Sequence, residues 1–288
     1  MCGIVGYIGK RQAAPILLGG LKKLEYRGYD SAGIAVRSQG GPTQIVKAKG
    51  KLKNLEEKLQ SVTVGGCCGI GHTRWATHGD PSETNAHPHR SDDGCVVGVH
   101  NGIIENYREI KEKLLNHGYS FYSETDTEVL VKLVDYYYKK YKVGPIDALA
   151  KTMVRVRGAY ALAVLFADYP DEIYVARKDS PMVIGISDED TYLASDVPAM
   201  LEHTRDVYYI DNLEMARLKA GEATFYDLNG DVVNKHKVHI DWDAECAEKG
   251  GYEHFMMKEI REQPRVVKDT LNAFTRDGAV ELDVYGLA

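Results

Sequence analysis

The residue in this sequence best placed to act as a nucleophile is Cys2, which directly follows the initiator Met1. A lone cysteine at the start of an apolar segment is most often a small buried core residue. Cysteine is also small enough to permit removal of Met1, and Gly3 adds no side-chain bulk beside the thiol. The freed α-amine, with an ordinary pKa of about 7.7–8.0, would then lie beside the sulfur and could act as its general base. Position alone leaves both interpretations open.

The sequence offers little support for other kinds of chemistry. The glycine-rich segment GGCCGIG at 65–71 lacks the GxGxxG order, and no GxxxxGK[ST] motif occurs, so we expect no nucleotide cofactor. Histidines are numerous between residues 72 and 100, at His72, His78, His87, His89 and His100. They form no HExxH motif and no CxxC-paired set. We therefore expect loop and core histidines and no metal, with a metal-binding domain kept as an alternative.

Bulk properties fit an ordinary cytoplasmic protein. The 288 residues are 44% hydrophobic and 27% charged, and the formal net charge of −6 gives no attraction to nucleic acid or anionic membranes. The cysteines are odd in number and irregularly spaced, at Cys2, Cys67, Cys68, Cys95 and Cys246. This pattern favours reduced thiols without a redox role. The N-terminus has no basic leader, and no apolar run is long enough to span a bilayer.

The elements that would position Cys2 change in character along the chain. In the first half, buried strands are expected at Met1–Gly9, Cys68–His72 and Cys95–His100, and further strands at Ala32–Val36 and Gln44–Ala48. Helical spacing predicts helices after Pro15, from Leu52, and at Asn106–His117, Thr125–Tyr141 and Ile146–Val156. After Gly158, strands separated by turns are expected at Ala159–Phe166, Glu172–Arg177, Met182–Ile186, Tyr192–Ser195, Val207–Ile210 and Ala223–Asp227. These patterns predict an α+β fold of antiparallel sheets with helices on their outer faces.

The C-terminal part of the sequence looks like a separate region. Residues 241–251 (DWDAECAEKGG) are polar and end in two glycines, which is typical of a linker. Two helices are expected beyond it, at Tyr252–Gln263 and Arg265–Phe274, with Pro264 opening the second. They are too little material for a domain, so we expect the chain to be part of a longer protein.

Six motifs in a fixed order carry a family resemblance. They are MCGIVGYIG at 1–9, LEYRGYDSAG at 24–33, HTRWATHG at 72–79, NAHPH at 85–89, HNGIIEN at 100–106 and SETDTE at 123–128. Together they closely resemble the glutaminase half of the glucosamine-6-phosphate synthase family, a branch of the N-terminal-nucleophile amidotransferases. The resemblance implies a four-layer αββα sandwich of two antiparallel sheets covered by helices.

The resemblance also implies a substrate, L-glutamine, and the residues that hold it. Arg74 matches the arginine whose guanidinium takes the α-carboxylate, and Asp126 matches the acid that takes the α-ammonium. Thr77 and His78 match positions that add hydrogen bonds around the glutamine. Without the resemblance, Arg74 and Asp126 would more often be solvated surface charges.

For the reaction, the resemblance implies attack of Cys2 on the glutamine amide to give a γ-glutamyl thioester. The side-chain amide of Asn101 and the backbone N–H of Gly102 match the oxyanion donors, worth about 3–4 kcal/mol each in known hydrolases. Trp75 matches a lid over an internal ammonia channel, and Arg27 a residue that orients the N-terminus. Taken alone, Asn101-Gly102 is a turn signature and Trp75 an ordinary packing residue.

The resemblance implies a domain plan as well. Residues 1–240 would be the glutaminase domain, 241–251 the linker, and 252–288 the start of a sugar-phosphate isomerase half that acts on fructose 6-phosphate. The sequence leaves oligomeric state open, a homodimer included. The alternative is a catalytically silent or unprocessed domain, acting as a binding or regulatory module, because a retained Met1 would block the Cys2 amine.

Overall fold

A computed structural model of the chain describes residues 2–38, 40–241, 251–276 and 279–280. The chain divides into two compact units, Met1–Asp241 and Trp242–Ala288. The linker expected at 241–251 lies outside the described residues except at its two ends. The larger unit contains every residue of the candidate site.

The first sheet of the larger unit has eight strands, and every pairing in it is antiparallel. Its strands, in spatial order, are β15 (Val238–His239), β11 (Asp206–Tyr209), β9 (Val183–Ile186), β10 (Thr191–Ala194), β1 (Gly3–Ile8), β4 (Cys68–Arg74), β2 (Ser31–Arg37) and β3 (Gln44–Lys49). The strand that follows Cys2 therefore lies in the middle of the sheet, with β4 beside it.

The second sheet has seven strands, also paired antiparallel. In order they are β14 (Val232–Val233), β13 (Glu222–Tyr226), β12 (Glu214–Lys219), β8 (Tyr169–Lys178), β7 (Gly158–Phe166), β6 (Val96–Ile104) and β5 (His89–Arg90). The sequence prediction missed β12, because EMARLK lacks β-branched residues and has no clean alternation of polar and apolar side chains.

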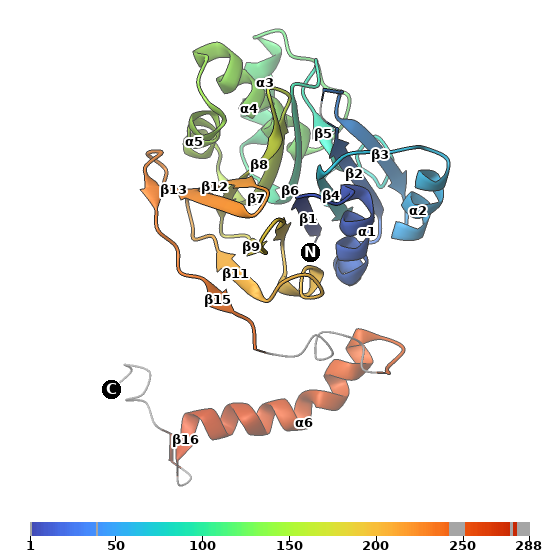
Figure 1. The fold of residues 1–288 in the computed structure, drawn as a ribbon, viewed down its shortest axis with the longest axis vertical. Coiled ribbons are helices and arrows are strands. Elements are labelled where there is room, and N and C mark those ends of the chain that lie inside the picture. Colours follow the sequence, from blue (N-terminus) through green and yellow to red (C-terminus); the bar gives the residue numbers. More distant parts are fainter. Residues whose placement is uncertain (1, 39, 242–250, 277–278, 281–288) are drawn as a thin grey trace. The chain divides into compact units, whose positions relative to one another are not determined.

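Helices cover the outer face of each sheet, as Figure 1 shows. They are α1 (Ala13–Leu24), α2 (Leu52–Gln60), α3 (Tyr107–Leu115), α4 (Asp126–Tyr141) and α5 (Pro145–Arg155), with short 3-10 turns η1 (Glu25–Arg27) and η2 (Val197–Ala199). Leu17, Leu21 and Leu24 form the buried stripe of α1, which packs on β1 and β4. On the other side, α4 packs on β6 and α5 on β8 and β12.

The main core lies between the two sheets. Ile4 and Ile70 from the first sheet meet Val97 and Ala163 from the second, all fully or almost fully buried. A second core lies between the outer face of the second sheet and helices α3 to α5. This arrangement confirms the expected αββα sandwich.

The smaller unit contains one long helix, α6 (Phe255–Phe274), and the short strands β16 (Thr275–Arg276) and β17 (Ala279–Val280). The expectation of two helices separated at Pro264 is wrong, since Pro264 lies inside α6. Proline removes one backbone hydrogen bond, but its φ is compatible with a helix, so the turns on either side can remain continuous. Within the described residues, no helix is long and apolar enough to cross a membrane.

Candidate active site

A cavity of about 300 Å³ gathers residues from distant parts of the larger unit. Its lining includes Cys2 before β1, Arg27 of η1, Arg74 and Trp75 at the end of β4, Thr77, Asn101 and Gly102 of β6, and Asp126 of α4. Eight of the nine predicted site residues therefore meet at one place. A larger cavity, about 840 Å³, is lined instead by residues such as Arg37, Cys67 and Lys219. Chemistry, rather than size, points to the smaller cavity.

Cys2 lines this cavity and is held by the main chain of Trp75, the residue that follows β4. Its Sγ accepts a hydrogen bond from the backbone N–H of Trp75 at 3.2 Å. Burial raises the pKa of the Cys2 thiol, against the lowering effect of that N–H. A thiol with a raised pKa is protonated at neutral pH, so it needs a base to become a nucleophile. A Cβ on Gly3 would lie 2.7 Å from Thr73 Oγ1, which explains the glycine beside the cysteine.

Asn101 and Gly102 lie within a strand and are not a turn, because they pair with Ala161 and Tyr160 of β7. The Asn101 Nδ2 donates to the backbone carbonyl of Cys2 at 3.0 Å. Gly102 has φ +120°, and a Cβ there would lie 2.0 Å from the carbonyl oxygen of Ala159. Glycine is therefore required at this position on two independent grounds.

Arg74 and Asp126 are buried and not solvated surface charges, being 3% and 4% exposed. The Arg74 Nη2 donates to the backbone carbonyls of His78 and Gly79, the latter at 3.1 Å. Its Nη1 is buried and has no hydrogen-bond partner among the described residues. The Asp126 Oδ2 accepts from the backbone N–H of Ile104 at 2.9 Å. A buried guanidinium with an unused donor is suited to bind an anionic group such as a carboxylate.

Comparison with known proteins relates this chain to a family. A family model described as a glutamine amidotransferase domain matches residues 72–202. The glutamine–fructose-6-phosphate aminotransferase (isomerizing) of Clostridium acetobutylicum is 52% identical over 273 residues, covering 95% of this chain and 44% of the relative. The enzyme of the same name from Caldanaerobacter subterraneus is 52% identical over 284 residues, covering 98% and 46%. The chain belongs to the glutamine amidotransferase family.

Solved structures agree with this assignment. The glutamine phosphoribosylpyrophosphate amidotransferase from B. subtilis, complexed with ADP and GMP, superposes with a TM-score of 0.69 at 25% identity. The match covers 80% of this amidotransferase and 50% of that chain. This amidotransferase also spans about half the length of the curated relatives it matches.

The remaining predicted residues lie around the cavity in different ways. Trp75 is 46% exposed and meets the Tyr29 ring edge-on at 5.5 Å, so it is not packed into the core. Arg27 forms an ion pair with Asp196 and donates to the Tyr26 hydroxyl at 2.9 Å. Both residues line the cavity of the amidotransferase together with Cys2.

Thr77 and His78 differ in position. Thr77 is exposed and lines the cavity, whereas His78 lines a neighbouring depression and packs edge-on against Tyr107 at 5.2 Å. His78 contributes to the site through its backbone carbonyl, which accepts from Arg74. A direct contact of its side chain with the substrate of this amidotransferase stays a prediction.

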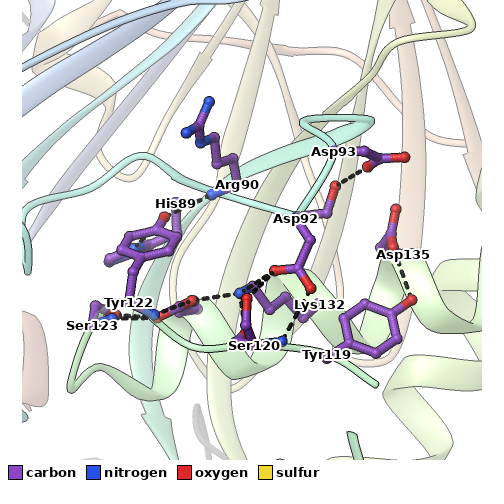
Figure 2. A network of polar contacts seen from close by, with 12 residues as sticks. His89, Arg90, Asp92, Asp93, Tyr119, Ser120, Tyr122, Ser123, Lys132 and Asp135 are labelled. Atoms are coloured by element: carbon purple, nitrogen blue, oxygen red, sulfur yellow. Dashed lines mark hydrogen bonds and ion pairs between the residues drawn. The ribbon is translucent and has the colours of Figure 1, made fainter. Parts of the chain in front are cut away.

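A buried polar network holds the start of α4, where Asp126 lies. Glu128 and Lys132 form an ion pair at 2.7 Å, and both side chains are 0% exposed. The Glu128 carboxylate also accepts from the backbone N–H groups of Tyr122 and Ser123, at 3.0 and 2.7 Å. Figure 2 shows the Lys132 side chain beside Asp92 and Ser120, and its amine donates to Asp92 at 2.7 Å and to the Ser120 carbonyl. Sequence analysis missed this network, although a lysine inside the apolar run VLVKLV was its signal.

Four of the histidines are buried near the cavity of the amidotransferase. They are His72, His87, His89 and His100. Burial lowers the pKa of each, that of His72 to about 3, so all four are neutral at physiological pH. Within the part of the chain that the structure describes, no group of three or more His, Cys, Asp and Glu side chains is arranged to hold a metal ion.

Proposed function

We propose that this domain hydrolyses L-glutamine to L-glutamate and ammonia through a thioester at Cys2. One observation carries the proposal: a sulfur, an amide donor, a buried guanidinium and a buried carboxylate converge on one cavity, from Cys2, Asn101, Arg74 and Asp126. The cavity volume, about 300 Å³, suits a small ligand such as a free amino acid.

The two buried charges would bind the amino-acid end of glutamine. Arg74 Nη1 would donate to the α-carboxylate, and the Asp126 Oδ1, which does not accept the Ile104 N–H, would accept from the α-ammonium. Thr77 and His78 would add hydrogen bonds around the ligand. The side-chain amide would then extend toward Cys2.

The nucleophile would be activated by its own α-amine after removal of Met1. The amine takes the Sγ proton while sulfur bonds to the amide carbon, and the resulting oxyanion is held by Asn101 Nδ2 and the Gly102 N–H. The amine returns the proton to nitrogen, the C–N bond breaks and ammonia leaves. Water then loses a proton to the amine and attacks the thioester carbon. Cleavage of the S–C bond returns the proton to sulfur and releases glutamate.

In a longer protein, we propose that the ammonia serves synthesis of glucosamine 6-phosphate from fructose 6-phosphate. The support is the name of the relatives and their length, about twice that of this chain. Residues 1–240 would be the glutaminase domain, and 252–288 the start of the sugar-phosphate isomerase half. Trp75 would gate the ammonia path and Arg27 would orient the N-terminus. We also propose a cytoplasmic location, which rests on the cysteine pattern alone.

The test is glutamate release by protein whose intact mass confirms loss of Met1. Cys2→Ala should abolish glutamate release, because no other group in the cavity can form the thioester. Cys67→Ala is a matched control, since Cys67 is also partly buried but lines the larger cavity. It should keep the activity of the unsubstituted protein.

Two outcomes would contradict the proposal. Processed protein that binds glutamine without hydrolysing it would favour the silent binding module. Activity retained in Cys2→Ala would exclude Cys2 as the nucleophile.

A further inference from the structure

His72 lies directly behind Asn101, on the neighbouring sheet. It belongs to β4, pairs with Ile4 of β1 and Gly33 of β2, and is 0% exposed. Its Nε2 lies 2.9 Å from the Asn101 Oδ1. It does not line the cavity in which Cys2 and Asn101 meet. Any effect of His72 on the reaction must therefore pass through another residue.

The hydrogen-bond partners of Asn101 fix the orientation of its amide. The backbone carbonyl of Cys2 can only accept a hydrogen bond, so the Asn101 atom 3.0 Å away from it must be the NH2 group. The Asn101 oxygen then faces His72, and His72 Nε2 must be the donor. The Asn101 NH2 group is therefore a donor to Cys2, and the Asn101 oxygen is the acceptor for His72 Nε2–H.

The environment of His72 suits a permanent neutral donor. Burial lowers its pKa to about 3, so the ring carries a single proton throughout the physiological range. The ring lies against that of His87, with centroids 4.1 Å apart and planes tilted by 34°. Its Nδ1 is buried without a hydrogen-bond partner among the described residues. In the neutral tautomer with the proton on Nε2, the Nδ1 atom carries no hydrogen and therefore needs no acceptor.

We propose that His72 is a positioning residue whose Nε2–H holds the Asn101 amide with its NH2 group toward Cys2. This inference rests on the proposed function, in which Asn101 donates to the oxyanion. Nδ2 has two hydrogens, so one can bind the Cys2 carbonyl while the other serves the oxyanion. With the amide rotated by 180°, a carbonyl oxygen would face both the Cys2 carbonyl and the developing negative charge. The imidazole prevents that rotation without adding a charge beside the thiol.

A first experiment compares two substitutions in processed protein. His72→Gln keeps an N–H donor near the position of Nε2, whereas His72→Leu removes the donor at similar volume. His72→Leu should lower kcat about 10- to 100-fold, less than the roughly 10²–10³-fold loss on removing an oxyanion donor itself. The KM for glutamine should change by no more than about threefold. His72→Gln should recover most of kcat.

A double-mutant cycle separates positioning from general damage. In an Asn101→Ala background, His72→Leu should cause little further loss of kcat, because there is no amide left to orient. Equal losses in His72→Leu and His72→Gln, or a full additional loss in the Asn101→Ala background, would overturn the proposal. Activity retained in Cys2→Ala would instead overturn the proposed function, so the two failures are distinguishable.

A spectroscopic measurement tests the same inference without using activity. In ¹⁵N-labelled protein, the His72 ring should carry its proton on Nε2 between about pH 5 and 9, with Nδ1 unprotonated. The same tautomer should persist in Cys2→Ala, which leaves Asn101 in place. A ring protonated on Nδ1, or one that titrates near pH 6.5 in folded protein, would overturn the proposal.

Discussion

The two walls of the cavity are held by different kinds of interaction. On the strand wall, which carries Cys2 and Asn101, the support is a neutral imidazole and main-chain groups. On the helix wall, which carries Asp126, the support is the fully buried ion pair of Glu128 and Lys132. Cys2 and Asn101 would meet the reacting atoms, whereas Asp126 would meet only the charged end of the ligand.

The buried ion pair supports α4 and not the strands that hold Cys2 and Asn101. A full charge close to the thiol would change its pKa and the potential at the oxyanion. The ion pair lies on the side of α4 that faces the preceding loop, where its partners include Asp92 and the backbone N–H groups of Tyr122 and Ser123. A buried charge is costly unless it is fully partnered, and this one is. We therefore expect changes in the helix wall to affect stability and KM, and changes in the strand wall to affect kcat.

The largest expected effect is on stability, in Lys132→Met. Removing the amine leaves the Glu128 carboxylate buried without its counter-charge, which costs about 3–5 kcal/mol in comparable buried pairs. The free energy of unfolding, measured by urea denaturation, should fall by that amount.

Lys139→Met is the matched control on the same helix. Lys139 also pairs with an acid four residues earlier, Asp135, and with a loop acid, Asp93, both at 2.8 Å. Its side chain is 42% exposed, and the buried Asp135 keeps a hydrogen bond from the Tyr119 hydroxyl at 2.8 Å, so the loss should be smaller than that in Lys132→Met. If the two variants lose equal stability, burial of the ion pair is not what holds the helix wall.

The same contrast explains what could be predicted from the sequence. Strands and helices with regular spacing were predicted because local patterns suffice for them, as with the Leu17, Leu21 and Leu24 stripe of α1. The convergence on the cavity was reached through ordered motifs, because no local pattern relates Cys2 to Asn101. Lys132 was missed because its burial depends on a loop that folds back over the helix. His72 was one of five histidines expected to be loop or core residues, and nothing in the sequence indicated Asn101 as its partner.

An intermediate effect is expected on substrate binding, in Asp126→Asn. The substitution keeps an oxygen that can accept from Ile104 N–H, but it removes the charge that would meet the α-ammonium. A hydrogen bond to a charged group contributes about 1.5–3 kcal/mol, so the KM for glutamine should rise about 10- to 100-fold while kcat changes little. Steady-state kinetics measure both constants.

The control for that variant is Glu124→Gln, in the same motif. Glu124 is exposed and accepts from Asn85 Nδ2 at 3.1 Å, and it does not line the cavity. Its kinetic constants should match those of the unsubstituted protein. An unchanged KM in Asp126→Asn would remove Asp126 from the ammonium site.

The smallest single-residue effect is expected in the pH dependence of stability, and it belongs to the strand wall. Burial lowers the folded-state pKa of His72 to about 3, and lowers those of its neighbours His87 and His100. In the unfolded chain a histidine has a pKa of about 6.5. Below that pH the unfolded state binds protons that the folded state does not, so stability is fully present above pH 6.5 and falls as the pH decreases. With a folded-state pKa of about 3, His72 contributes about 1.4 kcal/mol per pH unit over this range. His72→Gln should therefore show a shallower loss of stability between pH 6.5 and 5, by that amount, in urea denaturation at a series of pH values. An identical slope in the two proteins would mean that His72 takes up its proton in the folded state as it does in the unfolded chain.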